Sequence, residues 1–212
     1  MKNITKLFLY LNLCLTLLAC SKISPKGEIE VKDVTVENFT KLNLKGDFKV
    51  FFAKGNQNLV SVETYPNVYK NLDIEVENGI LTIEENRKTD QVDFYNITIF
   101  GKNDLNEVSL SDKVEMNVSG QVKTPEFSLH LKGNSKFMGA VIAPKSKIEM
   151  AEKSNANILG ETKNLNLKLA DSASIMAPYF YVENLEILSK NGASAGLNID
   201  QEMKGTLENT SK

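Results

Sequence analysis

The sequence predicts an all-β protein: a single-stranded parallel β-helix-like solenoid with antiparallel hairpins in its N-terminal part. Two observations lead to this prediction. From Glu28 onward apolar and polar residues alternate, and no window of about 11 residues has convincing helical periodicity. In the second half, a short apolar strand, a corner of small or polar residues and a second short strand recur at a drifting period of about 20 residues, as in solenoids.

Residues 1–19 are predicted to be a lipoprotein signal peptide. Lys2 and Lys6 precede an apolar run over 7–18. As a helix this run of about 12 residues would be roughly 18 Å long, too short for a hydrocarbon core of about 30 Å. A basic start followed by a short apolar run is typical of secretory signals. The run ends Leu17-Leu18-Ala19-Cys20, which resembles the bacterial lipobox. That resemblance implies cleavage before Cys20 and lipidation of its thiol, as with palmitate; the alternative is an ordinary signal with an incidental cysteine.

Residues 20–27 are predicted to be a tether anchored in the membrane through the lipid on Cys20. Their polar composition has little to pack. Cys14 would leave with the signal, so the mature chain would have no free thiol. Ser21 stands where some Gram-negative lipoproteins carry an inner-membrane retention Asp. We therefore expect a bacterial cell-envelope location, with the outer membrane favoured and the leaflet left open.

Residues 28–212 are predicted to form one β-solenoid domain whose first half consists of antiparallel hairpins and short strands. Strands alternate around Leu42–Leu44 and Phe48–Phe52. Asn78-Gly79 separates two alternating runs, which is a strong hairpin signal. Tyr95–Ile99 is the last strand expected in this half.

Four repeats define the predicted coils of the second half. They open at Phe127, Ile148, Leu165 and Leu185, at intervals of 21, 17 and 20 positions. A degenerate earlier copy begins at Val108. The residues expected to share one corner of the coils are Gly133, Ser154, Asp171 and Asn191. The residues expected in the looser returns are Pro125, Pro144 and Pro178. A β-sandwich is the rival architecture, because it also uses short alternating strands; the matching corners favour the solenoid.

Composition excludes several classes of function. The chain has 25 Lys+Arg and 27 Asp+Glu, giving a net charge of −2, so it lacks the basic footprint of a nucleic-acid binder. It has one Arg, one His and no Trp. We therefore expect no nucleic acid partner, no cofactor, no metal and no catalytic residue.

Several segments resemble one bacterial family. Phe39-x-x-Leu42-x-Leu44-x-Gly46-x-Phe48-x-Val50 is similar to the opening of the domain called putative auto-transporter adhesin, head GIN. Residues 78–83, Asn-Gly-Ile-Leu-Thr-Ile, are similar to its N-G-x-L-x-I segment. The corners at Gly133-Asn134-Ser135 and 191–194 resemble its S-G-x-S turns, whereas Ser154 and Asp171 depart from the commoner Gly. The resemblance covers roughly residues 34–207 and implies a β-helix-like fold in a lipid-anchored or secreted protein.

Few side chains are candidates for a site. Tyr179 and Tyr181 form an aromatic cluster with Phe180, and they point outward if Phe180 points inward. Outward aromatic rings can stack on sugars, although a return loop that packs its own corner is the favoured explanation. Asp171-Ser172-Ala173 resembles a short O-glycosylation acceptor pattern, which makes Ser172 a candidate modification site. His130 is expected on the surface, without a catalytic partner.

Three functional hypotheses remain. The first is a lipid-anchored cell-envelope binding or adhesion module, without catalytic activity, for a glycan or protein ligand. The second is a glycan-active enzyme on the same scaffold, which would need acids from neighbouring coils to converge. The third is a structural envelope lipoprotein with no specific ligand.

Overall fold

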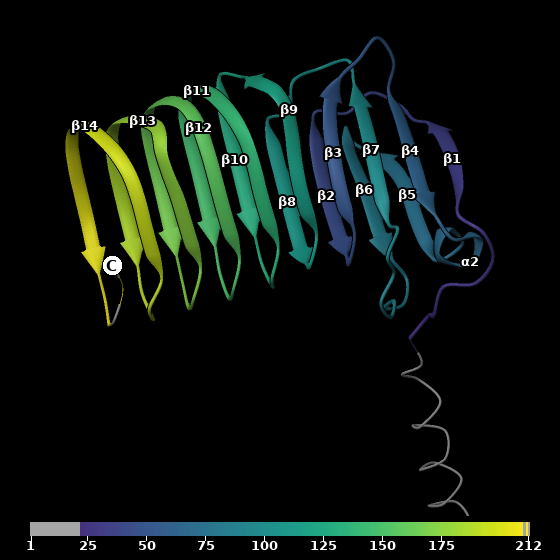
Figure 1. Ribbon diagram of the computed structural model, residues 1–212. Helices are drawn as coiled ribbons and strands as arrows, with labels where there is room; N and C mark the ends of the chain where they lie inside the picture. The colour runs from purple at the N-terminus through teal and green to yellow at the C-terminus, as the bar shows by residue number, and fades with distance from the viewer. Residues whose placement is uncertain (1–21, 210, 212) are drawn as a thin grey trace, which may run out of the picture.

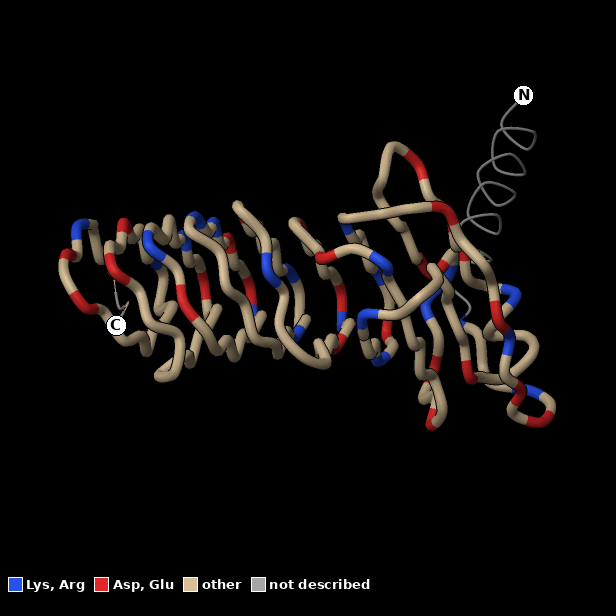
Figure 2. Tube along the Cα trace, turned by 90° about the horizontal axis from the view of Figure 1, so that it is seen from above, with Lys and Arg blue, Asp and Glu red and all other residues tan. Residues whose placement is uncertain are grey.

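The computed structural model describes residues 22–209 and residue 211. Cys20 and the predicted signal peptide lie outside the described residues. The described chain forms an elongated stack of strands with one short helix, and its two ends lie at opposite ends of the stack (Figure 1). Seen from above, the stack is a long rod (Figure 2).

The strands form one mixed sheet that curls into two facing rows. We call the strands that lead into the tight corners the entry row and those that leave the corners the exit row. The strands are β1 (Glu30–Thr35), β2 (Lys41–Gly46), β3 (Lys49–Lys54), β4 (Leu59–Thr64), β5 (Leu72–Glu77), β6 (Ile80–Glu85), β7 (Asn96–Gly101), β8 (Glu107–Asp112), β9 (Glu115–Lys123), β10 (Glu126–Leu131), β11 (Lys136–Met150), β12 (Asn155–Leu169), β13 (Ser174–Ser189) and β14 (Ser194–Leu207), and the helix is α2 (Pro66–Tyr69).

The predicted parallel solenoid is confirmed. From β8 onward the chain winds through about five turns. In β11 to β14 the first half of each strand belongs to the exit row and the second half to the entry row. The register is in phase from coil to coil: Ile148 lies opposite Leu129 on one side and Leu167 on the other. A β-sandwich is thereby excluded.

The N-terminal part contains the expected antiparallel pairs, β1 with β4, β4 with β7, and β5 with β6. Asn78 and Gly79 both have positive φ, 52° and 76°, as the predicted β5–β6 hairpin requires. Two features were not predicted. β2 and β3 stack in parallel as a further coil, and the coil β6–β7 lies on the far side of it from β8–β9. The order of coils in space therefore departs from their order in the sequence.

The corners repeat one backbone conformation. In six successive coils the residue two positions after the last inward position of the entry strand is left-handed. These residues are Asp112, Gly133, Glu152, Asp171, Asn191 and Asn209, with φ between 55° and 73°. Gly133, Asp171 and Asn191 were predicted here. The prediction that Ser154 turns its corner was wrong, because Glu152 does so. Ser154 lies two positions later and is buried, and its hydroxyl donates to the carbonyl of Ala151 (2.8 Å).

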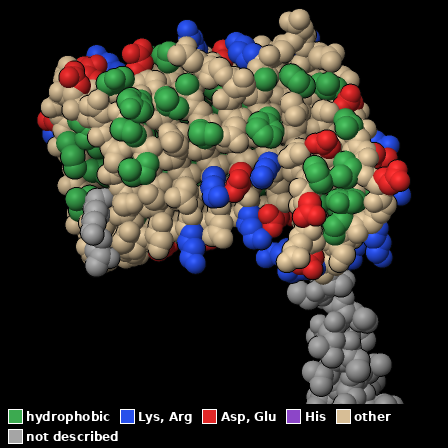
Figure 3. Space-filling model, viewed as in Figure 1, with side chains coloured by type: hydrophobic (Ala, Val, Ile, Leu, Met, Phe, Trp, Pro, Cys, Tyr) green, Lys and Arg blue, Asp and Glu red, His purple; other side chains and the backbone are tan. Residues whose placement is uncertain are grey.

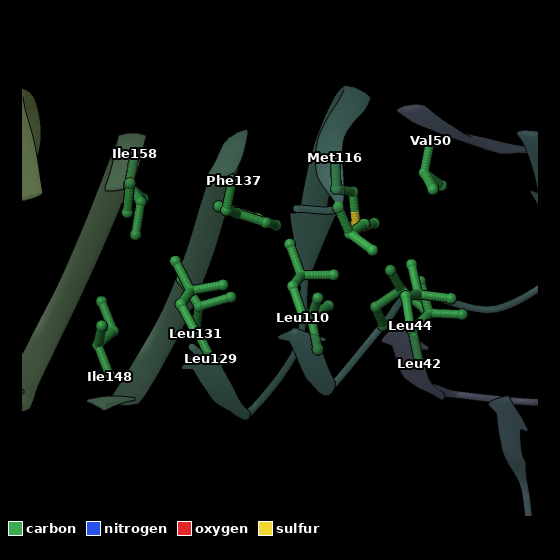
Figure 4. Packing of buried hydrophobic residues seen from close by; sticks show 14 of the residues in the cluster. Leu42, Leu44, Val50, Leu110, Met116, Leu129, Leu131, Phe137, Ile148 and Ile158 are labelled. Carbon is green, nitrogen blue, oxygen red and sulfur yellow. The ribbon is translucent and has the colours of Figure 1, made fainter. Parts of the chain in front are cut away.

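Pro125 lies in the return between β9 and β10, as predicted. The later returns differ from the loose loops expected. Pro144 and Pro178 do lie between the two rows, but inside the long strands β11 and β13, because pairing continues on both sides of each proline. Inside the stack, apolar side chains of the two rows point toward one another (Figure 4). Leu44, Val50 and Leu129 are completely buried. Each such side chain contributes roughly 1.5–3 kcal/mol on full burial.

Candidate binding surface

Tyr179 and Tyr181 project from β13 into solvent, as predicted. Their exposed fractions are 65% and 56%. Phe180, which lies between them, and Val182, which follows Tyr181, are buried, with exposed fractions of 1% and 0%. Strand alternation explains the orientation, because the two apolar neighbours are drawn into the core. Both phenol rings are therefore available to a ligand.

A bulge in β13 makes Tyr179 protrude. The pairing with β14 passes from Ala177–Leu197 directly to Tyr181–Asn198, so Pro178, Tyr179 and Phe180 have no opposite residues on β14. Bulges break the ladder locally and re-aim side chains, and they are frequent beside functional sites. Tyr181 resumes the ladder between Glu161 of β12 and Asn198 of β14.

Tyr181 lies in a groove of about 730 Å³ on the return side of the stack. Four successive coils contribute to it, from Pro144 of β11 to Gln201 of β14. Its charged lining residues are Glu161, Lys163, Glu183 and Asp200, which gives three acids and one base. A ring face beside carboxylate and amide groups suits a neutral, hydroxyl-rich ligand and disfavours an anionic one.

An apolar band crosses the outer face of the exit row, and sequence reasoning missed it. Phe51, Met138 and Met176 are 46%, 50% and 58% exposed. Phe51 and Met138 lie at one outward level on either side of Asn117, and Met176 follows Ile175, which lies opposite Ala156 of the intervening coil. Hydrophobic side chains are spread along the stack on the face that Figure 3 presents. Alternation alone places each of these residues outward, but only the coil register aligns them. Contiguous exposed apolar patches mark interaction surfaces, and in this band polar residues of the intervening coils separate the apolar side chains.

The outer face of the entry row is charged instead. Glu149 contacts Lys147 (3.0 Å), Lys168 (3.3 Å) and His130 (3.2 Å to Nδ1). Partial burial of Glu149 opposes its ionisation. Hydrogen bonds from Lys147 and Lys168 and the charges of Lys147 and His130 outweigh that effect and hold its pKa below the usual range. His130, expected without a partner, thus faces a carboxylate, but Lys147 and Lys168 neutralise that carboxylate.

A polar cluster joins the out-of-order coils. The backbone N–H of Asp47 donates to Glu85 Oε2 (3.1 Å), and the Thr89 hydroxyl donates to Glu85 Oε1 (3.0 Å). Lys113 Nζ donates to Asp47 Oδ2 (2.5 Å). Burial raises the pKa of Glu85, and burial together with the nearby Glu85 raises the pKa of Tyr95 above its usual range. These contacts link the β2–β3 corner, the β8–β9 corner and the loop after β6, so they hold the junction together.

Ser172 lies exposed at the corner between β12 and β13, next to the left-handed Asp171. Its backbone N–H donates to the carbonyl of Glu152 (2.8 Å), which fixes the turn and leaves the hydroxyl on the surface. Its glycosylation and the ligand contacts of Tyr179 and Tyr181 stay predictions. Within residues 22–209 and 211, no group of three or more His, Cys, Asp and Glu side chains is placed to hold a metal ion.

Comparison with known proteins decides the family. The family described as "putative auto-transporter adhesin, head GIN domain" matches residues 38–212. The chain belongs to this family. The match begins just before the segment from Phe39 to Val50 that carries the resemblance in the sequence, and it includes all coils of the solenoid.

Solved structures share the fold of this head GIN domain at low sequence identity. A putative adhesin from Bacteroides fragilis is 13% identical, with a TM-score of 0.65, covering 88% of this chain and 99% of that one. A putative lipid binding protein from Parabacteroides distasonis is 16% identical, with a TM-score of 0.62, covering 89% and 99%. A putative adhesin from Parabacteroides merdae is 14% identical, with a TM-score of 0.61 and the same coverage. Among curated proteins, none matches significantly.

In the part of the chain that the structure describes, no helix has the length and apolar character needed to cross a membrane.

Proposed function

We propose that this head GIN domain is a lipid-anchored adhesion module of the bacterial cell envelope that binds a glycan around Tyr181 without catalysing a reaction. The observation that carries the proposal is the pair of exposed tyrosines on a bulged strand, one of them inside a groove rich in hydrogen-bonding groups. On either side of the bulge β13 pairs with β14, over Ser174–Ala177 and over most of Tyr181–Ser189, so the rings are presented on a rigid frame.

The pairing of the acids on the entry row supports a binding role over hydrolysis for that face. Hydrolysis of a glycan needs two carboxyls placed on either side of the bond to be cut. On the entry row, Glu126 pairs with Lys145 (2.8 Å) and Glu149 with two lysines, while Glu186 accepts from Asn166 (3.0 Å). These acids are matched to cations and amides on the same strand or the neighbouring coil, which is the pattern of a solvated structural surface.

A glycan array tests the binding site. The chain from residue 21 onward contains every described element, and we expect it to retain a set of neutral oligosaccharides. Tyr181→Ala should weaken retention by about tenfold or more, equivalent to about 1.4 kcal/mol, and Tyr179→Ala should weaken it as well. Phe94→Ala is the matched control, because Phe94 is 48% exposed and outside the groove. Equal retention by the parent and both tyrosine variants would refute the site.

Metabolic labelling tests the anchor. Cells expressing the full chain should incorporate radiolabelled palmitate, and Cys20→Ala should remove both the label and the protein from the membrane fraction. Density fractionation should then place the labelled protein with the outer membrane. A labelled Cys20→Ala variant would contradict lipidation at this residue.

A protein ligand is the second candidate, and the apolar band of Phe51, Met138 and Met176 favours it. Met138→Glu with Met176→Glu should then abolish adhesion to a protein-coated surface. Leu188→Glu is the control, because Leu188 is 39% exposed on the opposite, entry row. Adhesion that survives the double substitution and is lost in Tyr181→Ala would assign binding to the groove instead.

A further inference from the structure

The last strand, β14, leaves the apolar core open. In the described residues β14 pairs with β13 alone. Register places Met203 opposite Leu185 and Leu207 opposite Ser189, and those partners are buried, at 4% and 0% exposed. Met203 and Leu207 occupy the same inward positions but are 54% and 50% exposed. The strand at this end of the rod (Figure 1, yellow) therefore shows both unpaired backbone and core side chains.

The opposite end of the rod is closed. There α2 places Val68 in the core with no exposed surface. The edge strands at that end are only six residues long, and β5 carries acids at Asp73, Glu75 and Glu77. Short, charged edge strands resist further pairing, whereas a long, mostly uncharged edge invites it. The 14 residues of β14 include only three charged ones, Asp200, Glu202 and Lys204.

We propose that a second copy of this chain docks on this end, with the two β14 strands paired antiparallel about a two-fold axis at Gln201. This register pairs residues 195–207 of the two copies. Inward residues then face inward residues: Met203 faces Ile199 of the partner subunit, Gly205 faces Leu197 of the partner subunit, and Leu207 faces Ala195 of the partner subunit. In two of the three pairs a large side chain meets a small one, so the surface is self-complementary, as an isologous interface requires.

β14 bends at Gln201, between its exit-row half and its entry-row half. The two-fold axis passes through this bend and runs along the two halves of the strand, so the exit-row half of one copy pairs antiparallel with the entry-row half of the other. The corners of both copies then stay on one side. Lys22, the first described residue, lies at that corner side beside Asp47 and Lys113. Both tethers therefore leave toward the same side, and both subunits can be anchored in one membrane; this step rests on the proposed lipid on Cys20. An axis perpendicular to the rows would send the tethers in opposite directions. The arrangement also brings the two Tyr181 grooves together, because Asn198 and Gln201 line both the groove and the interface.

Charge predicts the salt dependence of the dimer. In this register Glu202 faces Asp200 of the partner subunit, a like-charge contact that occurs twice. Lys204 lies 2.9 Å from Glu202 and partly neutralises it. Because salt screens the repulsion between these exposed carboxylates, the dissociation constant of the dimer should fall between low and physiological ionic strength.

Cysteine cross-linking tests the pairing. The chain from residue 21 onward contains no cysteine, so an introduced one is the only reactive thiol. Gln201→Cys places two thiols across the axis, where paired strands bring Cα atoms about 4.5–5.5 Å apart, within disulfide range. We expect at least about tenfold more oxidised dimer from Gln201→Cys than from Lys153→Cys, an exposed corner position, and loss of the dimer when Met203→Glu or Leu207→Glu is added.

Sedimentation of the parent chain is the independent measurement. It should show twice the chain mass at about 100 μM. A single-chain mass at this concentration, equal cross-linking at Gln201→Cys and Lys153→Cys, or dimers insensitive to both glutamate substitutions would overturn the proposal. None of these measurements requires lipid or ligand, and Tyr181→Ala should dimerise normally. Failure of the dimer would therefore leave the glycan proposal standing, and the reverse also holds.

Discussion

Substituting Gly133 by alanine tests whether the coils are as closely stacked at their corners as the structure shows. Gly133 has a φ of 73°, and a Cβ there would lie 2.5 Å from the carbonyl oxygen of Asp112 on the preceding coil. Gly120 is the matched control, because its φ is 83° and no atom lies within 4 Å of its Cβ position. The two alanine variants therefore share the backbone strain and differ in the clash.

The expected magnitudes follow from these two contributions. A left-handed alanine costs about 1–2 kcal/mol, of which about 0.4–1 kcal/mol is offset because alanine restricts the unfolded chain. Gly120→Ala should therefore lower the free energy of unfolding by about 1 kcal/mol. Forcing a methyl against backbone adds about 1–3 kcal/mol, so Gly133→Ala should cost about 2–4 kcal/mol in total.

Thermal unfolding followed by circular dichroism measures this difference. For a chain of this size, each kcal/mol corresponds to about 2–4 °C, so the melting temperature of Gly133→Ala should lie roughly 2–12 °C below that of Gly120→Ala. Equal melting temperatures would refute the stacking argument, because they would mean that the corner moves aside at no cost.

Three further predictions concern glutamates. Glu149 has a lowered pKa in the folded state, so its contribution to stability is present above the unfolded pKa and lost as pH falls through the folded pKa; Glu149→Gln should flatten that acid dependence in pH-resolved melts. Glu85 has a raised pKa, so the folded state loses stability as pH rises from the unfolded to the folded value, and Glu85→Gln should remove that loss in the same assay. Glu152 is strained at a φ of 64°, so Glu152→Gly should raise the free energy of unfolding in urea by about 1 kcal/mol, and an unchanged or lower value would contradict the assigned corner.

Local patterns in the sequence predicted the repeating parts of the fold, because their causes are local. Alternation puts Leu129 in the core whichever coil packs beside it, and Asn78-Gly79 forms a hairpin from its own backbone preferences. The stacking of β6–β7 outside β2–β3 has no such signal, because Leu42 and Leu81 belong to equally apolar strands and only tertiary packing selects their neighbours. The wrong prediction of Ser154 at the corner, where the structure has Glu152, has the same origin. Both residues are polar, and the register of Met150 decides which one turns the corner.

The candidate site also has a part that the sequence predicts and a part that only the folded structure shows. Tyr179 and Tyr181 could be placed on the surface from their apolar neighbours, whereas the band of Phe51, Met138 and Met176 appears only when three separate coils are brought into register. The bulge that lifts Tyr179 depends on a mismatch in length between β13 and β14, which neither strand shows alone.

The shared fold and the proposed binding specificity depend on different residues. Inward positions need only be apolar and of suitable size, so solved structures at 13–16% identity keep the same stack. Outward positions contribute little to that packing and are free to differ between members. Under the proposed function, outward side chains such as Tyr181 and Met138 therefore set the ligand, and the shared fold does not. Exchanging outward residues between two members of the family, with their inward residues left in place, should transfer ligand preference without changing the melting temperature by more than a few degrees; transfer only with the inward residues would show that coil shape sets specificity instead.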